Sequence, residues 1–287
     1  MTAVLRHELR LYFRSLTAYV FGAFLLAFVG LGAMRYNIQA AVSNFEFVLG
    51  YISLIFVVIV PILTMRVLAE ERRQKTDQLL YALPISTVQV ILGKYLALLT
   101  VYLIPLCVVG IYPLVFSQYG DVYLPTAYGS LFAFFVMGAA LIALGVFLSS
   151  LTDNQGFAAG LGVAVILFNY YSVSLSEYVS STAFGSFAVL CVLSLVLAAV
   201  ISHLTRNDTF GYAIGGALLL MLGVCYFVNN DAFEGLLPNV MSQLSLFERF
   251  YTFVNGVFDM TAIIYYSSVI AFFLFLSVQS LEKRRYN

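Results

Sequence analysis

Seven charged residues stand within twelve positions of an otherwise apolar chain, and their types and spacing are suited to charge-assisted binding. Residues 66–77 hold seven of the 28 Asp, Glu, Lys and Arg residues. Apolar runs at 47–69 and 91–116 flank this segment, so it must join two membrane spans and lie in water. Carboxylates and guanidinium groups form the stronger, charge-assisted hydrogen bonds. We therefore expect a polar partner to bind this segment.

Residue patterns for other chemistry are missing from the sequence. Gly93 and Lys94 are followed by Tyr95, and the spacing of a phosphate-binding Walker loop is absent. The chain also lacks the H-E-x-x-H and G-x-S-x-G patterns, and its three cysteines have no paired spacing. We predict no catalytic residue, no metal site and no cofactor.

Composition places the chain in a membrane. It is 62% hydrophobic and 10% charged, with a mean hydropathy of +0.97, whereas soluble domains are about 45–50% apolar and about 25% charged. Continuous apolar runs of about 20 residues cross a bilayer as helices. The predicted fold is an all-α, polytopic helix bundle that forms a single transmembrane domain over residues 1–287. We predict eight spans, at 17–36, 47–69, 91–116, 127–150, 156–174, 182–203, 209–228 and 260–281.

The basic residues predict the orientation, because Lys and Arg are retained on the cytoplasmic side of a membrane. With the N-terminus inside, 12 of the 14 basic residues are cytoplasmic, and only Arg35 and Arg249 are outside. Both termini and residues 66–77 are therefore predicted to be cytoplasmic. No charged residue falls near the centre of a span, which argues against a secondary carrier, since carriers generally place ionisable groups there.

Three segments outside the central spans have helical patterns. Residues 1–16 place leucines on one face and arginines on another, which predicts an interfacial helix; a simple basic anchor is the alternative. Over residues 70–90, a charged helix ends at Pro84, and Ser86 caps the next helix. We expect the outer segment 229–259 to lie along the outer membrane surface with one apolar helical face. Its shared face would consist of Val240, Leu244, Phe247 and Tyr251.

Residues 56–95 carry a series of short motifs. They are Pro61, LTMR at 63–66, AEER at 69–72, Thr76 with Leu79 and Leu80, Pro84 with Ile85, and GKY at 93–95. This series resembles the permease subunits of type-2 ABC transporters, specifically those of the gliding-motility-associated branch. The run 245–285 is similar to the last outer segment and final span of the same family.

The resemblance implies a permease subunit of an ATP-driven ABC exporter in the bacterial cytoplasmic membrane. Such a subunit forms the translocation path and is not itself an enzyme, because separate cytoplasmic ABC ATPase subunits hydrolyse ATP. The other implied partners are a second permease copy or paralogue, an accessory envelope subunit and membrane lipid, with no nucleic acid. The residues expected to couple to the ATPase are Glu70, Glu71, Arg72, Arg73, Thr76, Leu79, Leu80 and Pro84.

The chain departs from the family pattern in three places. The family usually has a glycine where this chain has Lys75 and a glutamate where it has Gln78. Members typically have six spans, whereas residues 182–228 add a helical hairpin, which we interpret as two full spans or as a partly re-entrant pair.

Two other functions remain open on the sequence. A stand-alone secondary carrier or membrane enzyme would work without an ATPase. A non-transporting ABC-type complex would use ATP for mechanical or signalling work at the envelope.

Overall fold

The computed structural model of the chain describes residues 1–75, 86–205 and 208–286. Within these ranges the chain forms helices and no strand, which confirms the predicted all-α class. Two compact units are present: Met1–Tyr170 with Leu246–Asn287, called unit 1, and Tyr171–Ser245, called unit 2. The helices that begin in unit 1 are α1 (Thr2–Arg14), α2 (Leu16–Ala33), η1 (Met34–Gln39), α3 (Glu46–Ile52), η2 (Ser53–Ile55), α4 (Phe56–Thr64), α5 (Ala69–Arg73), α7 (Thr87–Val109), α8 (Tyr112–Phe116), α9 (Leu124–Leu151), α10 (Gln155–Ser176), α14 (Leu246–Val254) and α15 (Met260–Tyr286). Those of unit 2 are α11 (Ala183–Thr205), α12 (Asp208–Val228), η3 (Asn230–Phe233) and α13 (Leu236–Gln243).

Six helical segments in the described part of the chain are long and apolar enough to cross a membrane. They are Leu16–Gln39, Glu46–Arg73, Thr87–Phe116, Leu124–Leu151, Gln155–Ser176 and Met260–Lys283. Six of the predicted spans lie inside these segments. In α11 and α12 the described apolar stretches, Ala183–Val196 and Gly215–Val228, are shorter than a span. The predicted count of eight is therefore not confirmed and stays a prediction.

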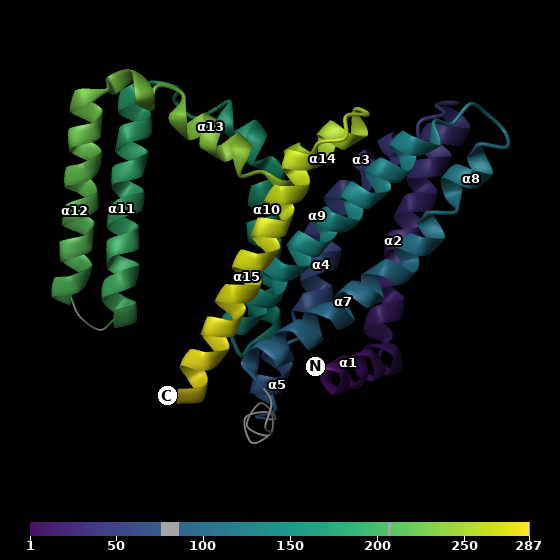
Figure 1. Cartoon of the computed structure of the whole chain (residues 1–287), viewed down its shortest axis with the longest axis horizontal. Helices are drawn as coiled ribbons and strands as arrows, with labels where there is room; N and C mark the ends of the chain where they lie inside the picture. The colour runs from purple at the N-terminus through teal and green to yellow at the C-terminus, as the bar shows by residue number, and fades with distance from the viewer. Residues whose placement is uncertain (76–85, 206–207, 287) are drawn as a thin grey trace. The chain divides into compact units, whose positions relative to one another are not determined.

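Helix α9 forms the centre of unit 1, where it packs against α4, α7, α14 and α15 (Figure 1). In the apolar windows of Glu46–Arg73 and Leu124–Leu151, 72% of residues are buried, against 22–39% in the other four spans. Glycines let neighbours approach α9 closely. A Cβ atom at Gly145 would lie 2.3 Å from Thr64 Oγ1, and one at Gly138 would lie 2.6 Å from the Tyr102 ring. Side chains of α4 and α7 thus pack directly against the α9 backbone at these glycines.

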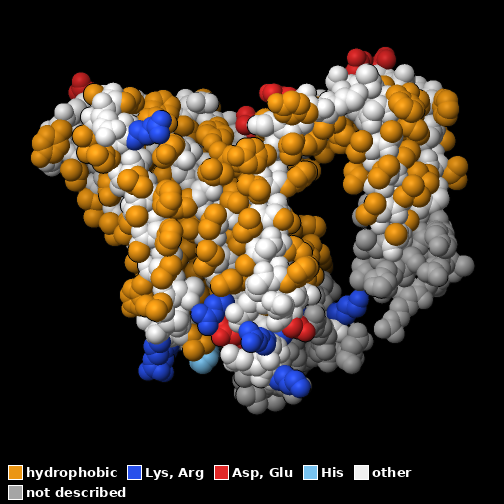
Figure 2. Space-filling view, turned by 180° about the vertical axis from the view of Figure 1, so that it is seen from behind, with side chains coloured by type: hydrophobic (Ala, Val, Ile, Leu, Met, Phe, Trp, Pro, Cys, Tyr) orange, Lys and Arg blue, Asp and Glu red, His pale blue; other side chains and the backbone are white. Residues whose placement is uncertain are grey.

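Charged side chains gather at the ends of unit 1. The N-terminus, α5 and the C-terminus lie at the same end (Figure 1). On the face in Figure 2, hydrophobic side chains cover the middle of the bundle, while most Lys and Arg side chains lie at that same end. A hydrophobic belt with basic residues at one end is the pattern of a multi-pass membrane protein.

Unit 2 contains an antiparallel hairpin, in which α11 and α12 pack along each other (Figure 1). The Phe187 and Tyr226 rings stack with centroids 4.5 Å apart, and Phe233 of η3 packs on both rings. The Gly235 N–H donates a 2.8 Å hydrogen bond to the Ser181 carbonyl, which ties the start of α13 to the residues before α11. An aromatic cluster and a backbone bond therefore hold one end of the hairpin.

The helical face predicted from Val240 to Tyr251 does not continue through one helix. The chain instead makes η3, α13 and α14, and the helical run is interrupted at residues 244–245 between α13 and α14. Val240 is 42% exposed on α13, whereas Phe247 is 1% exposed on α14. The apolar spacing was correct for each short helix, but the break gives α14 its own buried face of Leu246, Phe247, Phe250, Phe253 and Val254.

Candidate functional site

Four of the residues predicted to couple to an ATPase, Glu70 to Arg73, lie on α5, at the end of the second span. The other four, Thr76, Leu79, Leu80 and Pro84, lie outside the described residues. Arg73 is exposed, but Glu70, Glu71 and Arg72 contact other parts of unit 1. Three of the four described residues thus contact the protein itself.

Lys94 joins three separate elements in a buried cluster. Its ammonium group lies 2.7 Å from Glu8 Oε1 on α1 and 2.6 Å from Glu71 Oε1 on α5, and it donates a third bond of 3.1 Å to the Val67 carbonyl. The Lys94 side chain is only 1% exposed. A charge removed from water must be paired to be tolerated. Glu8, Glu71 and Lys94, called the Lys94 joint, therefore hold α1, α5 and α7 together.

The G-K-Y motif at 93–95 explains how α7 reaches its neighbours. At Gly93, α1 crosses so closely that a Cβ atom would lie 2.9 Å from Val4 Cγ1 and 3.0 Å from Val4 Cβ. Lys94 then enters the joint. The buried Tyr95 hydroxyl donates a 3.1 Å hydrogen bond to the Ala139 carbonyl of α9. Successive residues of the motif thus contact α1, α5 and α9.

We expect Gly93→Ala to lower the free energy of unfolding by about 1–3 kcal/mol, because the added methyl group overpacks the crossing with Val4. Unfolding of the purified chain in mixed micelles by titration with a denaturing detergent measures this. The matched control is Gly160→Ala, since no heavy atom lies within 4 Å of a Cβ at Gly160. That control should be neutral or up to about 1 kcal/mol more stable. Equal changes in unfolding free energy for the two variants would contradict a close crossing of α1 and α7 at Gly93.

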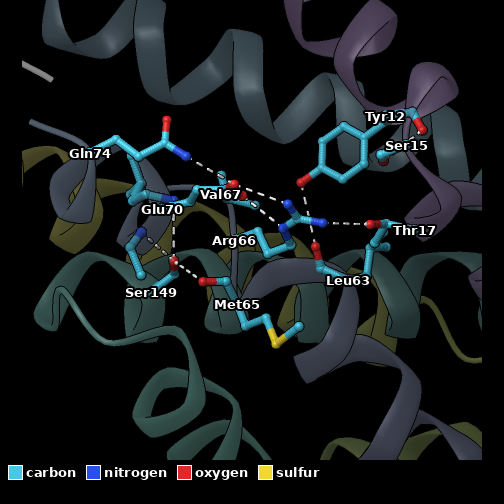
Figure 3. A network of polar contacts seen from close by, with 12 residues as sticks. Tyr12, Ser15, Thr17, Leu63, Met65, Arg66, Val67, Glu70, Gln74 and Ser149 are labelled. Atoms are coloured by element: carbon cyan, nitrogen blue, oxygen red, sulfur yellow. Dashed lines mark hydrogen bonds and ion pairs between the residues drawn. The ribbon is translucent and has the colours of Figure 1, made fainter. Parts of the chain in front are cut away.

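A second group of contacts surrounds Arg66 (Figure 3). Its guanidinium donates to both carboxylate oxygens of Glu70, at 2.7 and 3.0 Å, and to Thr17 Oγ1 of α2 at 3.1 Å. Beside it, the Tyr12 hydroxyl of α1 donates to the Leu63 carbonyl at 3.4 Å. Burial raises the pKa of the Tyr12 hydroxyl well above its usual range, so this group stays a neutral donor. Arg66 thus links α2 to the start of α5.

The start of α5 is capped by another helix. The residue before it, Leu68, provides no side-chain cap. Ser149 Oγ of α9 instead accepts bonds from the Leu68 and Ala69 N–H groups, both 3.2 Å, and donates to the Met65 carbonyl (Figure 3). Such a cap satisfies donors that a helix N-terminus otherwise leaves without partners.

The other end of α5 is also bound to the bundle. Arg72 donates to the Ser150 carbonyl of α9, which also accepts a 3.0 Å bond from Ser280 Oγ of α15. Together, these contacts tie α5 to five helices of unit 1: α1, α2, α7, α9 and, through Ser150, α15. A short charged helix tied to several membrane helices can transmit a displacement.

Comparison with protein-family models finds a match over residues 29–176, slightly more than half of the chain, to the family described as ABC-2 family transporter protein. The chain belongs to the ABC-2 transporter family. Comparisons with curated proteins and with solved structures give no match. The ABC-2 chain is therefore a multi-pass permease component of an ABC transporter, and its family implies partnership with ABC ATPase subunits.

Lys75 of this ABC-2 permease stands in the left-handed backbone region, with φ of 57°, one residue beyond the C-cap Gln74 of α5. Its N–H donates to the Arg72 carbonyl at 3.1 Å, so it closes the end of the helix. Glycine is favoured at such a position because it has no Cβ atom to clash. The expected family glycine therefore has a physical reason, and this chain carries a less favourable residue there.

Lys75→Gly should raise the free energy of unfolding by about 0.5 kcal/mol. It relieves about 1–2 kcal/mol of left-handed strain, which exceeds glycine's entropic cost of about 0.5–1 kcal/mol. The control is Gln74→Gly at a φ of −86°, which should lose about 0.5–1 kcal/mol. Equilibrium unfolding of both variants under the same conditions measures the difference. Equal destabilisation would show that Lys75 is not strained.

Sequence reasoning missed the partners of Glu71. Lys94 was assigned to the GKY motif and to the cytoplasmic basic residues, without a partner, and Glu8 was given no role. One signal was present: Glu8 is the single acid in the helix Thr2–Arg14 of the ABC-2 chain, among three arginines. The predicted cap at Ser86 is confirmed, since Ser86 Oγ accepts a hydrogen bond from the Gln89 N–H.

Proposed function

We propose that the chain is the permease subunit of an ATP-driven ABC exporter of the gliding-motility-associated branch. It forms the translocation path with a second permease copy or paralogue. Two cytoplasmic ATPase subunits drive it. The family match over residues 29–176 supports the permease role, and the motif series at 56–95 supports the branch.

The observation that carries the coupling role is the attachment of α5 to the membrane helices. Glu71 meets Lys94 of α7, Arg66 and Glu70 link α2 to α5, and Ser149 of α9 caps the helix. A force applied by an ATPase to the segment that follows α5 would therefore move several spans together. Rigid packed elements with buried polar contacts transmit such displacements.

The proposed orientation places α5 and both termini in the cytoplasm of a bacterial cell membrane. The basic end of unit 1 in Figure 2 supports it, because Lys and Arg are retained on the cytoplasmic side. The ATPase would then meet Arg73, which is exposed on α5, and the apolar residues Leu79 and Leu80 predicted to follow.

The coupling role is tested by co-expressing the permease with its cognate ABC ATPase and isolating the complex. We expect Glu70→Gln with Glu71→Gln to lower the ATP turnover of the complex about tenfold, equivalent to roughly 1.4 kcal/mol in the activation barrier. The ATPase should still co-purify if Arg73 and the following segment provide the docking surface. Arg35→Gln, at the opposite end of the first span, is the control and should change neither measurement.

Unchanged ATP turnover in the double variant would contradict coupling through α5. Transport or hydrolysis by the purified chain alone would favour a stand-alone carrier or membrane enzyme. ATP turnover without ATP-dependent movement of any cargo in sealed vesicles would favour mechanical or signalling work.

A further inference from the structure

Helix α1 has two faces with different surroundings. Val4, Glu8 and Tyr12, spaced four residues apart, point toward the bundle, where Glu8 meets Lys94 and Tyr12 meets the Leu63 carbonyl. The opposite face is exposed and contains Arg6 and Arg10. The protein therefore fixes which side of α1 remains available for an outside partner.

Three arginines form a row along the available side. Arg6, Arg10 and Arg14 are spaced four residues apart, so consecutive side chains lie one helical turn from each other. All three are exposed, and in the described part of the chain no ion pair joins any of them to an acid. The one acid of α1, Glu8, is turned inward to Lys94. This row, called the arginine stripe, is an uncompensated positive surface.

Apolar side chains beside the stripe indicate what covers it. Leu11 is 49% exposed and Phe13 is 37% exposed on α1, and Leu16 is 78% exposed where α2 begins. Only the extended residue Ser15 separates α1 from α2, the first span. The stripe is therefore held beside the end of an apolar span. A helix that exposes both arginines and large apolar residues at that position fits a bilayer surface rather than a soluble partner.

We propose that Arg6, Arg10 and Arg14 bind the phosphate groups of anionic phospholipids, with Phe13 and Leu16 inserted beside them. That the leaflet is cytoplasmic rests on the proposed function; the binding itself does not. Guanidinium groups suit this ligand because they bind phosphate oxygens in a bidentate manner. Each basic residue near an anionic membrane surface strengthens attachment about fivefold. Glu8 lies on the opposite face of the same helix. A lipid that holds α1 in place would therefore also stabilise the contacts of the Lys94 joint.

The chain contains no tryptophan, so Phe13→Trp places a single fluorescent reporter beside the stripe. The reporter protein is reconstituted without an ATPase in vesicles that contain increasing fractions of brominated phosphatidylglycerol or brominated phosphatidylcholine. Bromine quenches tryptophan on contact. We expect the anionic lipid to quench at a mole fraction at least fivefold lower than the zwitterionic lipid, and this preference should shrink as salt rises.

Three variants of the reporter protein decide the outcome. Arg6→Gln with Arg10→Gln and Arg14→Gln should abolish the preference, whereas the three corresponding Lys substitutions should retain most of it. A reporter at Phe258→Trp, in the loop before α15, should show no preference for phosphatidylglycerol. Equal quenching by both lipids, or a preference that survives the three Gln substitutions, would overturn the proposal. If the Gln variant keeps the lipid preference but, in a separate assay with ATPase added to neutral vesicles, no longer binds the ATPase, the stripe binds a protein partner instead.

Discussion

Lys94→Met is expected to lower the free energy of unfolding by about 3–5 kcal/mol, because it leaves two carboxylates in a buried site without their cation. The side chains of Glu8 and Glu71 are 7% and 23% exposed, so water compensates only partly. Methionine keeps a similar length and volume, which separates loss of charge from loss of packing. Equilibrium unfolding of the purified permease in mixed micelles measures the change.

The control for this prediction is neutralisation of the whole joint. Lys94→Met combined with Glu8→Gln and Glu71→Gln removes the buried charges together, and most of the lost stability should return. The exposed Lys75→Met should stay within about 0.5 kcal/mol of the original protein. A small effect of Lys94→Met alone, no larger than that of Lys75→Met, would show that the joint does not stabilise the fold.

Gly145→Ala should cost about 3 kcal/mol, at the upper end for overpacking a core. The new methyl group would lie 2.3 Å from Thr64 Oγ1 and 2.8 Å from Thr64 Cβ. Both helices at this crossing are buried on several sides, so neither can move away as easily as α1 can at Gly93. Unfolding in mixed micelles, measured beside Gly93→Ala, should show the larger loss for Gly145→Ala.

Thr64→Gly removes the side chain that the new methyl group of Gly145→Ala would meet. We expect the double variant to recover a substantial part of the stability that Gly145→Ala loses, although Thr64→Gly alone costs about 0.3–0.5 kcal/mol of helix propensity. Strict additivity of the two single effects would contradict a steric clash, because residues in contact couple and distant ones do not.

Sequence alone predicted the spans well, because the bilayer imposes a length and an apolar composition that can be read locally. Within the described residues, each of the six helical segments long and apolar enough to cross a membrane contains a predicted span. The cap at Ser86 was also predictable, since its partner Gln89 lies three residues away. The charged run was correctly recognised as unusual, but its contacts were assigned to an outside partner.

The contacts of α5 could not be predicted because they join distant residues. Lys94 and Glu8 are 86 positions apart, and the Ser149 cap reaches back 80 positions to the Ala69 N–H. The periodic patterns of a local sequence do not indicate contacts between residues so far apart. The break between α13 and α14 was missed for another reason: both helices are amphipathic, so a continuous apolar spacing concealed the interruption at residues 244–245.

The distance in sequence between Glu8 and Lys94 also sets the order in which contacts can form during synthesis of the chain. At about 5–20 residues per second, Lys94 is made on the order of ten seconds after Glu8. Until the third span enters the membrane, α1 has no buried cation to hold it and Glu8 must stay hydrated. Helix α1 therefore packs in its final position only after the first three spans have been inserted. Its packing thus depends on their correct insertion.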